Sequence, residues 1–82
     1  MPEYRVAVPI RTRTPEGIKH EATSFYTITT KTPSQARIEA EKQALEALRQ
    51  QQANNSIVGW YIHTDQIEAY DPKKKVNKHA PN

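Results

Sequence analysis

Arginines and aromatic rings are the residues of this 82-residue chain whose types and spacing best support binding chemistry. An aromatic ring can stack on a base or anchor a protein contact, and an arginine can hold a phosphate. Several of them recur at alternate positions of segments that read as strands, so they would share one face of a sheet. The candidate site for a protein partner or a nucleic acid comprises Arg5, Arg11, Arg13, Phe25, Tyr61 and His63.

The C-terminal segment is a second candidate contact region. The net charge is +3, yet residues 1–70 contain eight Lys/Arg and eight Asp/Glu, so the excess positive charge lies in residues 71–82. Two prolines and almost no apolar residues predict a disordered basic tail. Such a tail is often simply solvated, or it attracts phosphates and acidic surfaces without sequence preference. Its candidate contact residues are Lys73, Lys74, Lys75 and Lys78.

No motif for catalysis, cofactor binding or metal binding is recognised. His20, His63 and His79 lack the spacing of metal ligands. Paired carboxylates such as Glu39 and Glu46 are ordinary surface charge on a solvated helix. The chain has two glycines, which argues against a phosphate-binding loop. We therefore predict a non-enzymatic protein without a cofactor or a metal.

The length allows one small domain, which we place at residues 1–70. The absence of cysteine excludes disulfides and zinc–thiolate sites. No apolar run approaches the roughly 20 residues of a membrane span, and the N-terminus lacks the pattern of a signal peptide. We expect a cytoplasmic location.

A long helix is predicted from Thr32 to about Gln52. Thr32 and Gln35 have the spacing of a capping box, and Pro33 takes the first helical position. Strong helix formers follow without Gly or Pro, and the segment Asn54–Ser56 supplies the end. The helix presents an alanine stripe that we expect to pack on a sheet. This stripe comprises Ala36, Ala40, Ala44 and Ala47, flanked by Ile38, Leu45 and Leu48.

Three segments predict strands. Residues 4–11 alternate between apolar and other side chains, and residues 14–17 form a turn in which Gly17 can take positive φ. Residues 19–30 then form a hairpin with the first strand, and residues 57–63 follow the helix. Residues 65–70 either extend that last strand beyond a bulge or form a short fourth element. Pro9 cannot donate to a ladder, so it marks an edge strand, a bulge or a strand end.

These elements predict an α+β fold with the order β-β-α-β and a three-stranded, mainly antiparallel sheet. The second and third strands are joined by a helix and should run parallel, with the first strand between them in the order 2-1-3. If Pro9 is internal to its strand, the order 1-2-3 becomes the better expectation. One helix covers one face of such a sheet. The residues expected to face the helix are Val6, Val8, Tyr26, Ile28, Trp60 and Ile62.

The opposite face would stay uncovered, with Arg5, Arg11, Phe25 and Tyr61 as its anchors. This face can serve as a dimer interface, as a contact for another protein, as a nucleic-acid platform or as inert surface. Our leading interpretation is a small binding module that acts through protein–protein contact with a second copy or another protein. DNA or RNA binding through the same face and the lysine-rich tail is the alternative.

Two resemblances bear on this interpretation. The strand at Tyr4-Arg5-Val6, the turn with Gly17 and the threonine-capped helix together resemble the arm-type DNA-binding domains of phage integrases over about half of the chain. Here only Lys19 and His20 follow the turn where those domains have a basic strand, and a third strand follows the helix. The layout is also similar to that of short phage accessory proteins, some of which block host defence complexes. That resemblance implies a regulator or an inhibitor.

Overall fold

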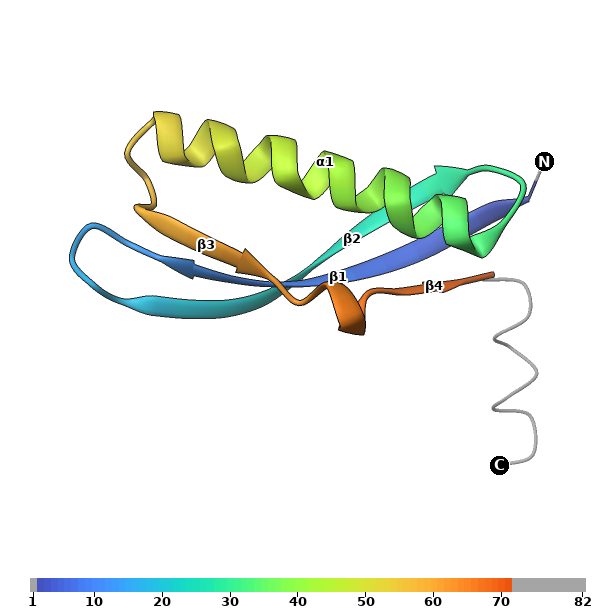
Figure 1. Ribbon diagram of the computed structural model, residues 1–82, viewed down its shortest axis with the longest axis horizontal. Coiled ribbons are helices and arrows are strands. Elements are labelled where there is room, and N and C mark those ends of the chain that lie inside the picture. Colours follow the sequence, from blue (N-terminus) through green and yellow to red (C-terminus); the bar gives the residue numbers. More distant parts are fainter. Residues whose placement is uncertain (1, 72–82) are drawn as a thin grey trace, which may run out of the picture.

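The computed structural model describes residues 2–71 as one helix packed on one face of a sheet (Figure 1). The four predicted contact lysines of the tail lie outside the described residues, as does almost all of the tail itself. The architecture is the predicted α+β fold, and it contains one strand more than the three we expected. The elements are β1 (Glu3–Arg13), β2 (Lys19–Thr29), α1 (Pro33–Ala53), β3 (Gly59–Ile62), the 3₁₀ helix η1 (Thr64–Gln66) and β4 (Glu68–Tyr70).

The start of α1 follows the predicted cap. Thr32 has extended backbone angles, and its hydroxyl accepts a hydrogen bond of 3.2 Å from the backbone N–H of Gln35. The other half of the capping box is replaced, because the Gln35 side-chain oxygen accepts from the Thr30 hydroxyl at 2.9 Å. This bond ties the first turn of the helix to the end of β2 and fixes where the chain leaves the sheet.

The end of α1 is set by its asparagines. Asn55 takes a left-handed φ of 64°, a conformation that asparagine tolerates better than most residues. The Ser56 N–H can then donate to the Gln51 carbonyl at 2.9 Å, which satisfies one of the last free carbonyls of the helix. The predicted helix end is therefore confirmed.

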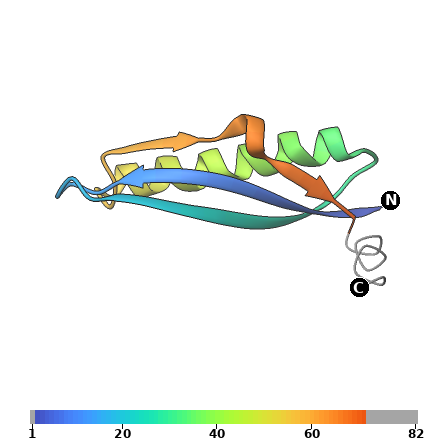
Figure 2. The same ribbon diagram turned by 90° about the horizontal axis from the view of Figure 1, so that it is seen from below.

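The sheet has the strand order β2-β1-β3, with β4 also paired to β1. All three pairings of β1 are antiparallel, so β2 and β3 run parallel to each other on either side of it, as predicted (Figure 2). β3 pairs with residues 10–13 of β1, and β4 pairs with residues 5–7. Residues 65–70 thus include a separate short strand on the same edge as β3.

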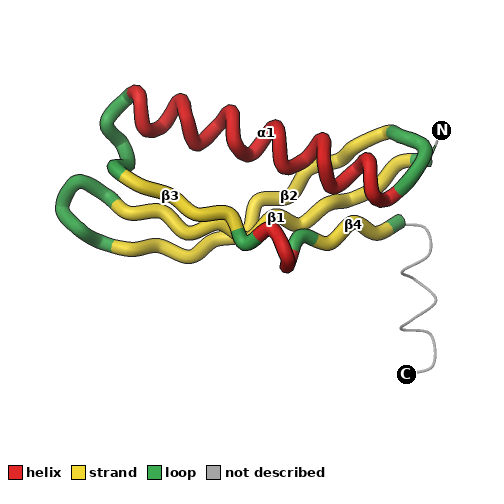
Figure 3. The backbone as a smooth tube through the Cα atoms, in the orientation of Figure 1, coloured by secondary structure: helices red, strands yellow, loops and turns green. Residues whose placement is uncertain are grey.

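Pro9 explains why this edge is divided into two strands. It lies inside the central strand β1, and its carbonyl accepts a hydrogen bond of 3.0 Å from the His63 N–H. Pro9 has no N–H to return, so the ladder cannot continue beyond it. The chain leaves the sheet at this point as η1 and rejoins it as β4 (Figure 3). Our expectation that an internal Pro9 favours the order 1-2-3 is wrong, because the break in the neighbouring strand accommodates the missing donor.

The core lies between α1 and the helix-facing side of the sheet. Val6 and Val8 of β1 are fully buried, as are three of the four predicted stripe alanines. Ala47 is exposed, which corrects its assignment to the stripe, and Leu48 takes the place because it continues the i, i+4 spacing. Ile38 is also exposed rather than flanking the core. The buried core comprises Val6, Val8, Ile10, Ile28, Ala36, Ala40, Ala44, Leu48, Ile57, Ile62 and Ile67, with Tyr26 and Trp60 packed partly against it.

The turn between β1 and β2 fixes the register of the hairpin. The Gly17 N–H donates to the Thr14 carbonyl at 2.9 Å, and the Thr14 hydroxyl accepts from the Ile18 N–H at 3.1 Å. Gly17 has a φ of 89°, which a residue with a side chain rarely adopts. As a consequence Arg13 and Lys19 become direct cross-strand partners.

Candidate binding face on the open side of the sheet

The side of the sheet turned away from α1 is called the open face here, and it consists of alternate residues of the strands (Figure 2). The structure confirms the predicted alternation, because the even-numbered residues of β1 point to the helix and the odd-numbered ones point away. The open face comprises Glu3, Arg5, Ala7, Pro9, Arg11 and Arg13 of β1, Lys19, Glu21, Thr23, Phe25, Thr27 and Thr29 of β2, and Gly59, Tyr61, Glu68 and Tyr70 with the half-buried His63.

Two large aromatic side chains are exposed on the open face. Phe25 has an exposed fraction of 55% and Tyr61 of 56%, so neither ring belongs to the core. The Arg5 guanidinium lies 5.7 Å from the centre of the Phe25 ring, which is a cation–π distance. The two residues meet because Phe25 pairs with Ala7, two positions along β1 from Arg5. The open face thus presents the Phe25 ring and the Arg5 cation side by side.

A polar cluster crosses the middle of the open face. The Arg11 Nε lies 2.5 Å from one Glu21 carboxylate oxygen, and the His63 Nε2 lies 3.4 Å from the other. The His63 ring also meets the Tyr61 ring edge-on, with centroids 5.0 Å apart. The hydrogen bond from Arg11 is the main cause that lowers the pKa of Glu21, and the charge of Arg11 and the contact with His63 act in the same direction. Partial desolvation opposes the shift without cancelling it.

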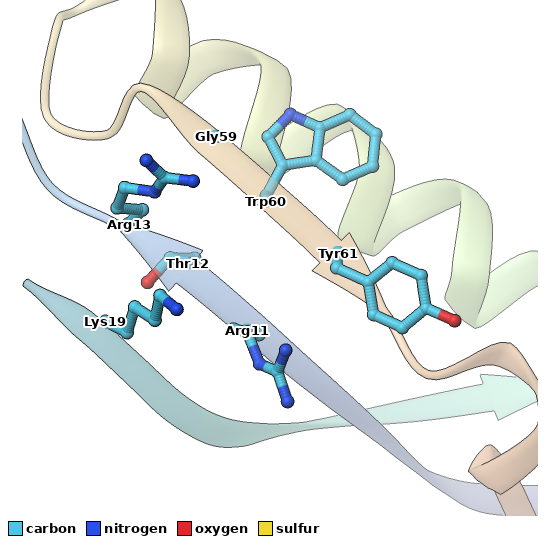
Figure 4. Close-up of a pocket in the computed structure, with 7 residues that line it drawn as sticks. All are labelled: Arg11, Thr12, Arg13, Lys19, Gly59, Trp60 and Tyr61. Atoms are coloured by element: carbon cyan, nitrogen blue, oxygen red, sulfur yellow. The ribbon is translucent and has the colours of Figure 1, made fainter. Parts of the chain in front are cut away.

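A hollow of about 290 Å³ lies at the hairpin end of the open face (Figure 4). Arg13 and Lys19 are cross-strand partners here, and neither forms an ion pair with any residue of the described part of the chain. Gly59 pairs with Arg13 on the other side, and a Cβ placed on Gly59 would meet no atom within 4 Å. We call this region the basic hollow; it is lined by Arg11, Thr12, Arg13, Lys19, Gly59, Trp60 and Tyr61.

Trp60 contributes to the basic hollow mainly through its position on β3. Its indole nitrogen donates to the Gln52 side-chain oxygen at 3.3 Å, so the ring lies on the helix side of the sheet. In Figure 4 the three cationic side chains gather beside β1 on the side of the viewer, whereas Trp60 extends over the helix. The hollow therefore presents cations to solvent, with Tyr61 among its lining residues.

The charges of the open face are separated along the strands. Arg13 and Lys19 lie at the hairpin end, whereas Glu3 and Glu68 lie toward the other end of β1. Within residues 2–71 neither Glu3 nor Glu68 forms an ion pair, and both are exposed. Arg11 and Glu21 neutralise each other between the two ends. The face thus carries a positive end, a neutral middle and an acidic end that also holds Arg5.

The predicted site residues divide into three groups. Arg11, Tyr61 and His63 form one connected cluster, Arg5 lies with Phe25, and Arg13 lies in the basic hollow. Residues that the sequence analysis did not select complete these groups. They are Lys19, Glu21 and Gly59. The turn with Gly17 contained a signal for Lys19 and Glu21, since the five residues between Arg13 and Lys19 fix which residues of the second strand pair with Arg13 and Arg11.

The described residues offer anion-binding and contact chemistry. Among residues 2–71 no group of three His, Asp or Glu side chains is placed to hold a metal ion. The only long helix of the same range, α1, carries too many polar and charged side chains to cross a membrane. Comparison with protein-family models, with curated protein sequences and with solved structures finds no match for this chain.

Proposed function

We propose that this protein is a non-enzymatic binding module whose open face contacts a protein partner. The observation that carries the proposal is the pair of exposed rings, Phe25 and Tyr61, on a sheet face that α1 does not cover. Aromatic and arginine side chains supply most of the binding energy at protein interfaces. Here Arg5 lies over the Phe25 ring and the Arg11 cluster lies beside Tyr61. The regulatory or inhibitory role suggested by the layout stays a prediction.

The arrangement of charge favours a protein over a nucleic acid. A nucleic-acid strand presents evenly spaced negative charge, which a binding surface matches with several cations in succession. The open face instead interrupts its cations with Glu3, Glu21 and Glu68. Mixed charge of this kind complements the mixed surface of another protein, and its carboxylates weaken the attraction to a uniform polyanion.

The size of the open face indicates a weak contact. The sheet is three strands wide at about 4.8 Å per strand, and its central strand β1 is 11 residues long at about 3.4 Å per residue. The area of the open face is therefore roughly 500 Å². A stable complex typically buries about 800 Å² on each partner. The open face alone therefore supports a transient or weak complex rather than an obligate one.

Nucleic-acid binding is the second candidate, and the basic hollow is the observation that favours it. Arg13 and Lys19 can hold a phosphate, and the neighbouring Tyr61 ring can stack on a base. Binding of this kind would weaken steeply with salt and would be lost in Lys19→Glu. Fluorescence titration of a labelled single strand across a salt series tests it.

Site-specific photo-crosslinking tests the proposed function. A photoreactive amino acid is placed at position 25 or 61, and at position 46 on the exposed side of α1 as a matched control. We expect adducts from positions 25 and 61 that protease removes and nuclease does not, with few adducts from position 46. Nuclease-sensitive adducts, or equal yields from all three positions, would contradict the proposal. Fractionation of the same cells tests the expected cytoplasmic location.

A further inference from the structure

We propose that a second copy of this chain docks on the open face, antiparallel to the first, with Glu68 of each copy entering the basic hollow of the other. The inference rests on the proposed function, since it names the protein that the open face contacts. It is carried by two observations within residues 2–71, a hollow whose Arg13 and Lys19 form no ion pair and carboxylates on the same face that also form none. A two-fold symmetry would bring the two together.

The basic hollow is suited to receive one carboxylate. Arg13 and Lys19 stand directly opposite each other on β1 and β2, and like charges in this position repel. No carboxylate of residues 2–71 pairs with either cation, because Glu21 is held by Arg11 and His63. Gly59 leaves open space beside Arg13 where any other residue would place a side chain. An incoming carboxylate relieves the repulsion and fills this space.

Glu68 is the carboxylate best placed to enter the hollow of a second copy. It is exposed on β4, where it pairs with Ala7 of β1, and it forms no ion pair within the described residues. Its partner Ala7 has a short side chain, and so does Pro9 on one side of it. Arg5 on the other side lies over the Phe25 ring and forms no ion pair with Glu68. The Glu68 side chain is therefore not screened by a large residue directly opposite it on the central strand.

The proposed dimer has a two-fold axis that lies between the two open faces and runs perpendicular to the strands. This axis places the hairpin end of one copy opposite the β4 end of the other. Glu68 is level with Ala7, and the hollow is level with Arg13, so an axis level with Ile10 brings the two into register. The symmetry repeats the contact, as an isologous interface requires. An axis parallel to the strands would instead place the two basic ends over each other, which is unfavourable.

The same geometry determines the strength of the dimer. Two faces of roughly 500 Å² bury about 1,000 Å² in total, which is the lower limit for a specific interface. Facing sheets pack about 10 Å apart, with their strands within about 30° of each other, so long side chains such as arginine and glutamate can meet between them. We expect a weak dimer in rapid exchange, and its ion pairs make it weaken as salt rises.

Charge-swapped variants of the full chain test this inference. The first variant combines Arg13→Glu with Lys19→Glu, and the second combines Glu3→Lys with Glu68→Lys. Each makes both ends of its own open face alike in charge, so each alone should be monomeric by sedimentation at concentrations where the wild type associates. An equimolar mixture of the two should associate at least as strongly as the wild type. In the mixed dimer each negatively charged end of the first variant faces a positively charged end of the second.

Matched controls keep the outcome clear. The variant Glu39→Lys with Glu46→Lys changes charge equally on α1, outside the open face, and should associate like the wild type. Gly59→Glu places a carboxylate beside the cations of its own copy, at a position where a Cβ meets no atom within 4 Å, and should abolish association. Thermal melting of every variant identifies any that is unfolded. If a double variant does not fold, Gly59→Glu alone still tests whether the hollow is needed for association.

Three results would overturn the inference. They are a wild type that stays monomeric at every concentration, charge-swapped variants that still self-associate, and a mixture that fails to associate. Crosslinks from positions 25 and 61 to a different protein, with a monomeric wild type, would overturn the dimer and leave the proposed function intact. Crosslinks to nucleic acid alone would overturn both.

Discussion

Arg13 and Lys19 face each other directly across the β1–β2 hairpin, and no carboxylate within residues 2–71 neutralises either of them. Such a pair costs stability in the isolated chain. Two residues away Arg11 has its own carboxylate, Glu21, so the hairpin places one neutralised cation and two free ones at the same end of the sheet. The two cations that form no ion pair within residues 2–71 give the open face its positive end.

Removal of the exposed rings should leave folding unchanged. Phe25→Ala and Tyr61→Ala each delete a side chain that is more than half exposed and whose ring meets one neighbour on the sheet, so the free energy of unfolding should fall by no more than about 1 kcal/mol. Leu48→Ala is the contrasting variant, because Leu48 is 3% exposed and its loss should cost about 2–5 kcal/mol. Urea denaturation measures all three. A large loss in Phe25→Ala would place that ring in the core and remove the basis of the binding face.

The alanine stripe should resist enlargement at one position and tolerate it at the next. Ala44→Leu inserts three carbons between α1 and the sheet and should lower the free energy of unfolding by about 1–3 kcal/mol. Ala47→Leu makes the same change on the exposed side of the helix and should be nearly neutral. Comparison of the two denaturation midpoints measures the difference. Equal effects would show that α1 does not pack as closely on the sheet as described.

The helix cap should contribute measurably to stability. Thr32→Ala removes the hydroxyl that accepts from the Gln35 N–H and should cost about 1 kcal/mol. Ser34→Ala changes a neighbouring exposed hydroxyl for which no hydrogen bond is seen within the described residues, and it should have little effect. Thermal melts of the two variants, followed by circular dichroism, separate a specific cap from a general effect of losing a hydroxyl.

Glu21 should titrate below its ordinary pKa of 4.5, chiefly because it accepts a hydrogen bond from Arg11. A folded-state pKa below the unfolded value means that the contribution to stability is present above the unfolded pKa and is lost as pH falls through the folded pKa. The contribution is small because both side chains are exposed. Carboxyl-detected NMR measures the pKa directly. Arg11→Met should raise it toward 4.5, and an unchanged value in that variant would contradict the assigned cause.

Much of the fold could be predicted from the sequence because its signals are local. The cap at Thr32, the asparagine end of α1 and the alternation of Val6, Val8 and Ile10 each depend on a few neighbouring residues. The division of the outer edge into β3 and β4 could not be predicted, since it follows from which residues lie opposite Pro9. This division depends on the pairing of segments that are distant in the sequence, so no local sequence pattern predicts it.

The candidate site was predicted in part for the same reason. Alternation along β1, β2 and β3 placed Arg5, Phe25 and Tyr61 on one face without knowledge of the pairing. The basic hollow depends on Gly59 lying opposite Arg13, a contact between residues 46 positions apart in the sequence. The ion pair between Arg11 and Glu21 likewise could be predicted only from the register of the hairpin. Features that depend on the juxtaposition of distant segments were therefore missed, whereas the exposure and facing of single residues could be predicted.

The central claim, that a second copy of the chain contacts the open face, is tested most directly by NMR of the wild-type chain over a dilution series. Phe25, Tyr61 and Ile38 are almost equally exposed, but only the first two lie on the open face. We expect the ring resonances of Phe25 and Tyr61 to move together as the protein is diluted, while the Ile38 methyl resonances stay fixed. Resonances that all stay fixed on dilution, or movement of Ile38 with both rings unchanged, would contradict this claim.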